Sequence, residues 1–351
     1  MEWQLFRTEE FLKYSSVWDD LNKRGSATLL LSSNFVGPAI KHYSSTTDLI
    51  AVCRTQARAI AMTILTPAGL GQWSTLQPVV TPLGLWVADP ETTINSTLPA
   101  LLRKLPGYPL VVSIRNQDSG LSPPPPSVGN ICSVHHMNTA AIHIEGPFAA
   151  YWETRNSKFK YNIRSRRKRL ERCGLTPHLE IITNPNDIEA ALDDYSRVEG
   201  IGWKGRSGTS LDRDLVARRF YLDILRNFAA TGRTRIYRYY YRDKIAATDL
   251  CIGDEKDLFV LKIAYDEEES HTAPSFLLRQ EQIKHTIDVE KVPRIEFYGP
   301  LMDWHRPWAT QVRPMYHINY YRCHFLRLAH QKMKESRRGR EPGAILPTND
   351  T

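Results

Sequence analysis

Apolar residues recur at helical and strand spacings in two successive stretches of the chain. In the first stretch, Phe11, Tyr14, Trp18 and Leu21 recur at helical spacing behind Thr8, which is suited to cap a helix. The predicted elements there are a helix at 8–21, strands at 27–31, 49–55, 57–65 and 83–87, a helix at 89–105 and a strand at 110–115. This order predicts an α+β unit with a mostly antiparallel sheet flanked by helices.

The second stretch begins near Pro147 and shows the clearer pattern. Its predicted elements are a basic helix ending at Gly174, a strand at 178–183, helices at 188–198 and 211–229, strands at 234–241, 245–252 and 257–264, a helix at 274–289, strands at 294–298 and 314–321, and a basic terminal helix. Four consecutive prolines at 123–126 predict a connector between the stretches. We therefore predict domains at 1–145 and 146–327, followed by a basic flexible tail at 328–351.

Composition agrees with a globular protein of two domains. The chain has 351 residues, of which 42% are hydrophobic and 24% charged. No uninterrupted apolar run of membrane-spanning length is present, and residues 1–4 lack the features of a secretory signal. The five cysteines are scattered and form no CxxC pair, so neither a disulfide framework nor a zinc site is indicated. These features predict a cytoplasmic location.

The net charge of +8 is concentrated in one segment. Residues 155–172 hold nine basic residues and a single acid, so the remainder of the chain is nearly neutral. Such a segment attracts phosphate-bearing partners, which are nucleic acid, anionic lipid headgroups or the pyrophosphate of a cofactor. A solvated helix face without a partner is the structural alternative.

Four sequence blocks suggest a family. They are Tyr151-Trp152 with the basic run 164–171 and Gly174; the segment 199–204 (EGIGWK); the segment 261–266 (LKIAYD) followed by 274–278 (PSFLL); and Phe297-Tyr298-Gly299 with Trp308. In this order they resemble the GNAT-like acyltransferases linked to bacterial exopolysaccharide and cellulose synthesis, the CelD-like group. The resemblance covers about residues 145–325, and the first half only by its layout. It implies a tandem pair of GNAT folds, like the peptidoglycan-building Fem ligases, in which the first half is degenerate.

The order of the elements in the second half is that of a GNAT core, and this order implies where a donor would bind. The strands at 259–264 and 295–298 should part, and the gap should admit the pantetheine arm of an acyl donor. The loop 271–275 should present backbone N–H groups to phosphate, although it reads HTAPS and has no glycine. The donor therefore stays open between acyl-CoA and an acyl carrier protein thioester. The candidate donor-binding residues are Lys262, Ala273, Ser275 and Arg279.

Acyl transfer needs a base for the acceptor and an acid for the departing thiol. Tyr265 could protonate the thiolate and Asp266 could accept the proton of the acceptor, with Asp249 as a further candidate base. Each has a structural alternative, namely core packing for Tyr265, the start of a turn for Asp266 and a solvent-facing strand position for Asp249. The candidate substrate-binding residues are Glu199, Trp203, Lys204 and Tyr298. No metal is expected, since the adjacent His135 and His136 would point to opposite faces of a strand.

The predicted function is transfer of an acyl group from a thioester to an amine or hydroxyl, in exopolysaccharide or cell-envelope biosynthesis. The alternatives are an aminoacyl-tRNA-dependent Fem-like transferase and a non-catalytic scaffold of a polysaccharide assembly. The predicted partners are the acyl donor and, through residues 155–172, an anionic membrane surface such as the inner membrane or a polysaccharide-synthesis complex. Nucleic acid is not expected, apart from tRNA in the first alternative, because no recognisable nucleic-acid-binding module accompanies the basic segment.

Overall fold

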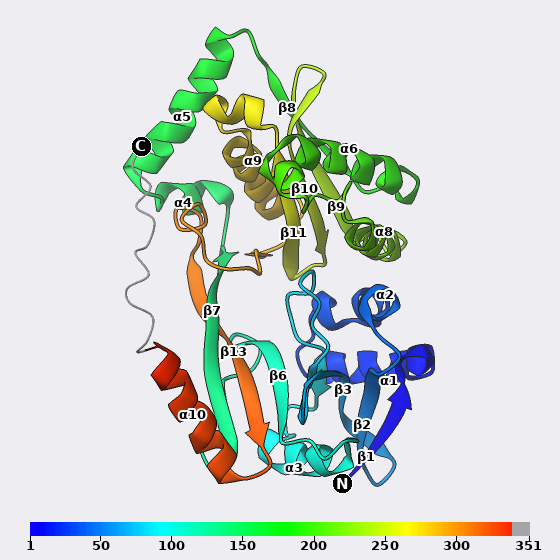
Figure 1. The fold of residues 1–351 in the computed structure, drawn as a ribbon. Helices are drawn as coiled ribbons and strands as arrows, with labels where there is room; N and C mark the ends of the chain where they lie inside the picture. Colours follow the sequence, from blue (N-terminus) through cyan, green and yellow to red (C-terminus); the bar gives the residue numbers. More distant parts are fainter. Residues whose placement is uncertain (339–351) are drawn as a thin grey trace.

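A computed structural model describes residues 1–338, apart from the side chains of Trp203, Lys204, Gln331 and residues 333–338. Its centre is one thirteen-stranded sheet that runs through both halves of the chain (Figure 1). Two long strands, β7 (Ile131–His143) and β13 (Gln311–Tyr321), lie side by side at the junction. Among the described residues, no helix combines the length and the apolar character needed to cross a membrane.

The first half has more elements than the sequence pattern predicts. They are β1 (Glu2–Arg7), η1 (Thr8–Glu10), α1 (Phe11–Arg24), η2 (Leu29–Leu31), α2 (Ser33–Tyr43), β2 (Leu49–Thr55), β3 (Arg58–Gly69), β4 (Gln72–Thr75), β5 (Trp86–Ala88), α3 (Ile94–Lys104), β6 (Val111–Asp118) and β7. The strand predicted at 27–31 is wrong, because Leu29–Leu31 form a 3-10 turn. The Trp18 indole N–H donates to the carbonyl of Leu31 at 2.6 Å and holds this turn against α1.

The second half follows its predicted order. Its elements are α4 (Phe148–Glu153), α5 (Ser157–Arg172), β8 (Pro177–Ile182), η3 (Pro185–Asp187), α6 (Ile188–Ile201), α7 (Trp203–Ser207), α8 (Leu215–Ala229), β9 (Thr234–Tyr241), β10 (Lys244–Gly253), β11 (Asp257–Tyr265), η4 (Glu267–Thr272), α9 (Pro274–Asp288), β12 (Arg294–Glu296), β13 and α10 (His324–Arg338). The basic helix is interrupted before Ser157, where Asn156 caps α5 by accepting the backbone N–H of Lys158 at 2.9 Å.

The strand order is palindromic. It reads β1-β2-β3-β4-β6-β13 and then β7-β12-β11-β10-β9-β8, and β5 pairs with β3 outside this order. Among the described strands, only β4–β6 and β11–β12 pair in parallel. Each half therefore supplies a meander, a helix and a parallel strand, and the two halves exchange their last strands. The predicted fold class, two GNAT-like units whose mostly antiparallel mixed sheets are flanked by helices, is confirmed by this arrangement.

The exchanged strands tie the two halves together. β7 comes from residues 1–145 but pairs with β12, and β13 comes from residues 146–327 but pairs with β6. The boundary at 145/146 stays a prediction, since one sheet crosses it. The predicted flexible tail overlaps α10 up to Arg338, and residues 339–351 lie outside the described part of the chain.

Helices cover both faces of the sheet. α1, α2, α6 and α8 contribute to one core cluster that is shared by both halves, whereas α4, α5 and α9 pack on the other face of the second half. α2 and α8 join the halves through Phe35 and Phe220, whose ring centroids are 5.8 Å apart, and through Lys41 and Asp223 at 2.8 Å. The shared core fixes the position of one half against the other.

Candidate functional site

The last two strands of the second half part as they leave the junction. β11 and β12 pair in parallel only from Asp257 to Phe259. Beyond this point the N–H of Phe297 donates to the carbonyl of Ala140 in β7 instead of to β11. The sequence placed the start of the gap at Phe259, but Phe259 still pairs with Glu296, so the gap opens beyond this pair. A bulge at Leu261 shifts the register of β11 against β10 just beyond the opening.

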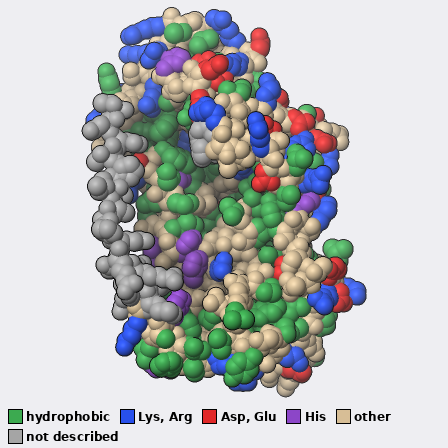
Figure 2. Space-filling view, in the orientation of Figure 1, with side chains coloured by type: hydrophobic (Ala, Val, Ile, Leu, Met, Phe, Trp, Pro, Cys, Tyr) green, Lys and Arg blue, Asp and Glu red, His purple; other side chains and the backbone are tan. Residues whose placement is uncertain are grey.

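A cavity of about 510 Å³ lies at the far end of β11. Its walls come from the end of β11, the start of α9, the loop that follows β12 and the end of α6. Apolar and aromatic side chains dominate the lining: Ile263, Tyr265, Phe276, Met302, Trp304 and Trp308. Figure 2 shows that this face of the molecule is hollowed between the two halves. An enclosed apolar space with a few polar groups is typical of a small-molecule site.

A buried ion pair forms part of the inner wall of the cavity. Arg279, on α9, lines the cavity and is 3% exposed, and its guanidinium lies 2.9 Å from the carboxylate of Asp249 in β10. The rings of Phe297 and Trp304 lie 5.2 and 5.9 Å from this guanidinium. Burial raises the pKa of Asp249 to about 6, although Arg279 acts in the opposite direction. Asp249 thus serves as the counter-ion of Arg279 and does not itself line the cavity.

A second buried carboxylate, Glu199, reaches the cavity from the end of α6. Its side chain lies 3.0 Å from Lys262 Nζ, accepts the Tyr195 hydroxyl at 3.1 Å and accepts the N–H of Leu211 at 2.9 Å. Lys262 extends from β11 toward α6 and α8, with Nζ 5.4 Å from the ring of Tyr221. Glu199 therefore stands where the cavity meets the opposite face of the sheet, and Lys262 holds it there without lining the cavity.

Two adjacent residues at the end of β11 have different surroundings. Tyr265 is half-buried and lines the cavity. Asp266 is 1% exposed, accepts the N–H of Glu268 at 2.9 Å and pairs with Lys244 at 2.6 Å. This pairing raises the pKa of Lys244. The structure therefore places Asp266 as the cap of η4 and not on the cavity wall, which leaves it poorly placed for the role of base.

The loop before α9 offers few donors to phosphate. Ala273 adopts a left-handed conformation with φ of 51°, and Pro274 has no N–H. The N–H groups of Phe276 and Leu277 donate to the carbonyl of Ala273 at 3.0 and 3.3 Å. Ala273 and Ser275 nevertheless line the cavity, as predicted for donor-binding positions. Acidic residues precede them, at Glu267–Glu269 in η4, so the loop is not built as a cradle for a diphosphate.

The basic helix α5 lies beside the start of α9. The Arg166 guanidinium sits 5.3 Å from the ring of Phe276, a residue of the cavity wall. Arg167 donates to Gln280 at 2.7 Å and pairs with Glu281 at 2.5 Å. These contacts bring the most basic segment of the chain to the rim of the cavity.

Of the predicted substrate-binding residues, Tyr298 does not line the cavity. Tyr298 lies at the junction of the two halves, where its hydroxyl donates to Asp118 at 2.6 Å. Arg313 pairs there with Asp118 at 2.7 Å and with Glu296 at 2.8 Å, and burial raises the pKa of Glu296 to about 7. The side chains of Trp203 and Lys204 lie outside the described part of the structure.

The sequence interpretation gave no role to the aromatic loop at 299–308. Trp304 and Trp308 line the cavity, and the Nδ1 of His305 accepts the N–H of Met302 at 2.9 Å. Burial lowers the pKa of His305 to about 4. The density of aromatic residues at 304–308 was the available signal. Among the side chains that the structure describes, no group of three or more His, Cys, Asp or Glu residues is placed to hold a metal ion.

The equivalent gap in the first half is filled by the chain itself. β4 and β6 pair in parallel at Gln72–Ser74, and the loop after β4 then occupies the opening. The N–H of Arg115 donates to the Thr75 hydroxyl at 2.9 Å, and a Cβ added to Gly84 would lie 2.2 Å from the carbonyl oxygen of Arg115. No room for a pantetheine arm is left at this point of the first half.

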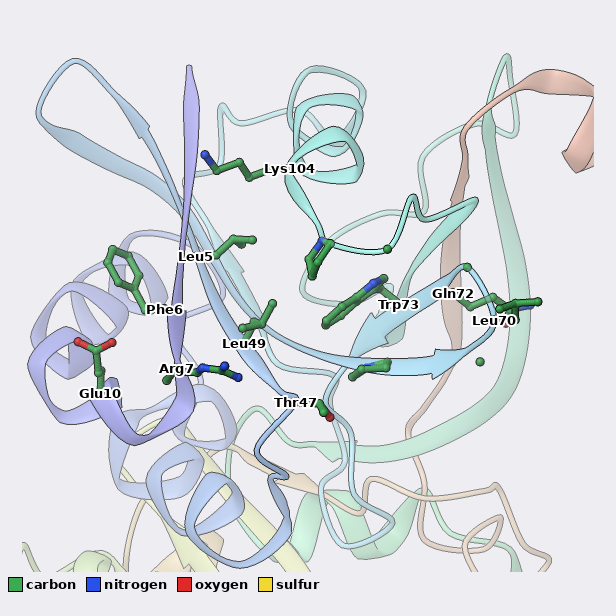
Figure 3. A pocket seen from close by; sticks show the side chains of 15 residues that line it. Leu5, Phe6, Arg7, Glu10, Thr47, Leu49, Leu70, Gln72, Trp73 and Lys104 are labelled. Atoms are coloured by element: carbon green, nitrogen blue, oxygen red, sulfur yellow. The ribbon is translucent and has the colours of Figure 1, made fainter.

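A larger cavity of about 810 Å³ lies elsewhere in the first half (Figure 3). It is bordered by the turn between β3 and β4 and by the end of α3, so it lies at the opposite end of the strands from the filled gap. Leu5, Leu49 and Trp73 line it, with Arg7 and Lys104 among the surrounding polar groups (Figure 3). Its position does not correspond to that of the cavity in the second half.

Comparison with known proteins agrees with this geometry. Residues 157–306 match the family model of the acetyltransferase (GNAT) domain, a match that covers less than half of the chain. These residues include β11, α9 and the aromatic loop up to residue 306, and hence most of the cavity wall except Trp308. Comparison with curated proteins found no match.

Solved structures resemble the whole chain. A crystal structure of FemX has a TM-score of 0.55 at 9% identity, with 94% of this chain and 99% of that chain covered. The C-terminal domain of a putative lysylphosphatidylglycerol synthetase from Agrobacterium fabrum has a TM-score of 0.53 at 10% identity, with 94% and 96% covered. The structure of L-PGS from Bacillus licheniformis has a TM-score of 0.52 at 13% identity, with 91% and 96% covered. At these identities the similarity establishes the fold alone.

Proposed function

We propose that the protein is an acyltransferase whose donor places its acyl group in the cavity between β11, α9 and the aromatic loop. The observation that carries this proposal is an apolar cavity at the parted strands β11 and β12, with Tyr265 and Glu199 on its wall. The GNAT-domain match over the same segment supports it. Because the equivalent gap in the first half is filled, we assign a structural role to that half.

Two side chains of the cavity wall supply the proton transfers. The nitrogen or oxygen of the acceptor attacks the acyl carbon, and Glu199 accepts the proton that this atom loses. The bond between the acyl carbon and the sulfur breaks, and Tyr265 donates a proton to the departing thiolate. Lys262, 3.0 Å away, and the N–H of Leu211 hold the carboxylate of Glu199 at the cavity wall. This assignment gives Glu199 the role that the sequence suggested for Asp266 and Asp249.

The cavity suits the thiol-bearing arm of a donor better than the nucleotide of coenzyme A. Its apolar lining fits a pantetheine chain with its acyl group, and Arg279 is too deeply buried to meet a phosphate at the rim. The loop before α9 offers few free backbone donors to a diphosphate. α5 is therefore the part of the rim that offers positive charge to the phosphate of a thioester donor.

We propose that the acceptor approaches through the hollow between the two halves that Figure 2 shows. The half-buried side chains of Leu261 and Tyr298 pack against the core cluster that both halves share. An amine or a hydroxyl of a polysaccharide or cell-envelope precursor is the acceptor we propose. Its support is the resemblance of four sequence blocks to enzymes of exopolysaccharide and cellulose synthesis. A cytoplasmic location, at or near the inner membrane, follows from that role.

A second candidate function is transfer from an aminoacyl-tRNA, as in the Fem-like alternative. The observation that favours it is the density of cations on α5 at the rim of the cavity. The resemblance to FemX in fold is consistent with it. A non-catalytic scaffold would have the same fold but transfer no acyl group.

The test is an acyl-transfer assay with purified protein and a set of donors. Acyl-pantetheine, acyl-CoA, acyl carrier protein and aminoacyl-tRNA are each offered with a small amine acceptor, and product is measured by mass spectrometry. With an active donor, Tyr265→Phe and Glu199→Gln should each lower kcat by about 100-fold, the usual scale for a general acid or base. Tyr240→Phe is the control, because Tyr240 lies on β9 and donates to Glu180 away from the cavity. Transfer from none of the donors, or full activity in both variants, would contradict the proposal.

A further inference from the structure

The cations of the segment 155–172 form two sets with different surroundings. In the inward set, Arg155 donates to the backbone carbonyls of 308–309, Lys160 pairs with Glu153, Arg166 lies over the ring of Phe276 and Arg167 pairs with Glu281. The outward set is exposed and consists of Lys158, Arg164, Lys168, Arg169 and Arg172. Within the part of the chain whose side chains are described, none of this outward set forms an ion pair. Figure 2 shows blue side chains gathered along the upper edge of the molecule, where α5 lies.

The outward set occupies one face of the helix. At about 100° per residue, all five cations and the exposed Tyr161 fall within an arc of roughly 140°. Arg164, Lys168 and Arg172 follow one another at intervals of four residues, and like charges at this spacing destabilise a helix. The exposed face therefore carries an electrostatic cost that no contact in the described structure offsets. A negatively charged partner would remove it.

The size of the basic face indicates a compact partner. A helix of sixteen residues is about 24 Å long. The segment 155–172 holds the whole excess of positive charge, so the remaining surface is close to neutral. A folded nucleic acid needs a broader positive surface, and the acidic residues Glu267–Glu269 of η4 lie next to α5. A single acidic helix of a small protein fits this face better.

We propose that the outward face of α5 binds an acyl carrier protein, which delivers its acyl-phosphopantetheine arm into the cavity. This inference rests on the proposed function and names the class of its donor. A carrier protein presents one phosphate and no nucleotide, so it does not require the diphosphate cradle that the loop before α9 lacks. Its acidic helix complements the five outward cations, and Tyr161, 66% exposed, supplies apolar contact within the face.

The test compares two donors in one charge-reversal variant. Lys168→Glu with Arg172→Glu should raise the apparent KM for acyl carrier protein by about 10-fold or more. Added salt should raise this KM in the unmodified protein and should not raise it in the variant. The same variant should use acyl-pantetheine, which has no carrier to dock, as well as the unmodified protein does. Arg103→Glu with Lys104→Glu is the matched control, because both residues are exposed at the end of α3, far from the cavity in sequence and fold.

The outcomes separate this inference from the proposed function. Transfer from acyl-pantetheine, together with equal kcat/KM for acyl-CoA and acyl carrier protein, would overturn the carrier inference and leave the acyltransferase proposal standing. Transfer from aminoacyl-tRNA in preference to the carrier would also overturn it. An equal loss with both thioester donors in the α5 variant would show that α5 acts on the cavity and not on a carrier. Absence of transfer from every thioester, acyl-pantetheine included, would overturn both proposals.

Discussion

Removal of Arg279 should expose the energetic role of the buried ion pair. The side chains of Arg279 and Asp249 are 4% and 2% exposed, and their charged atoms are 2.9 Å apart. Arg279→Met leaves the buried carboxylate of Asp249 without its counter-ion and with Gln282 as a remaining polar neighbour. Loss of one partner of a buried pair costs about 3–5 kcal/mol. Addition of Asp249→Leu removes the orphaned charge, so the double variant should recover most of the lost free energy of unfolding.

The pH dependence of this loss has a definite sign. Burial already raises the pKa of Asp249 to about 6, and loss of the guanidinium, which lowers it, must raise it further. An acid with a folded-state pKa above its unfolded value favours the folded state when protonated, so stability falls as pH rises between the two values. The loss of free energy of unfolding caused by Arg279→Met should therefore be small near pH 5. It should grow toward pH 8 by at most about 1.4 kcal/mol per pH unit.

Denaturant unfolding at pH 5 and pH 8 measures this effect, and the acyl-transfer assay runs on the same samples. A double variant that is as stable as the unmodified protein yet binds donor weakly would separate the function of Arg279 from its part in folding. The reasoning is refuted if Arg279→Met loses less than about 1 kcal/mol at pH 8, well under the scale for a broken buried pair. It is equally refuted if the double variant is no more stable than the single one.

Three further predictions concern stability. Asn156→Ala removes the cap of α5 and should lower the stability of that helix by about 1 kcal/mol. Amide exchange in the first turn of α5 should then be faster, and unchanged exchange would contradict this prediction. Burial raises the pKa of Glu296 to about 7, so ionisation of this carboxyl should lower the stability of the protein as pH rises from 4.5 to 7. Glu296→Gln should make this fall with pH smaller, and an unaltered dependence of the free energy of unfolding on pH would contradict the prediction. Trp308→Ala should cost about 3–5 kcal/mol in the same assay, since the ring is 1% exposed and packs edge-on against Phe159 at 4.7 Å; a loss below 1 kcal/mol would show a loosely packed site.

The sequence predicted the second half well because its elements follow strong local patterns. The strands β9 to β11 are separated by short turns, and α9 begins at a proline that suits the first turn of a helix. In the first half, α2 contains Gly37 and Pro38, which argue against a helix, yet Phe35, Val36 and Ile40 bury it in the shared core. Tertiary packing therefore overrode local propensity there.

β7 was missed for a different reason. Its middle, residues 133–138, is polar and partly exposed, so the strand has no continuous apolar face. Pairing with β12 and β13, which come from the other half, is what makes it a strand. A partner so distant in the sequence leaves no local signal.

The candidate site could be predicted only where strand order determines it. Tyr265, Ser275 and Glu199 reach the cavity because the order of elements brings the ends of β11 and α6 and the start of α9 together. The ion pair of Asp266 with Lys244 comes from the neighbouring strand, and nothing in the residues beside Asp266 reveals it. The position of Tyr298 likewise depends on Asp118 in the first half, which only the folded chain brings near.

The most direct measurement is photoaffinity labelling with an acyl-pantetheine that carries a diazirine in its acyl chain. The described part of the chain has a cavity in each half that allows a comparison. The account predicts saturable labels in the peptides that contain Ile263–Tyr265 and 302–308, prevented by an excess of unlabelled acyl-pantetheine. Saturable labelling at Leu5 or Trp73 in the first half instead, or no saturable labelling at all, would contradict the assignment of the acyl site.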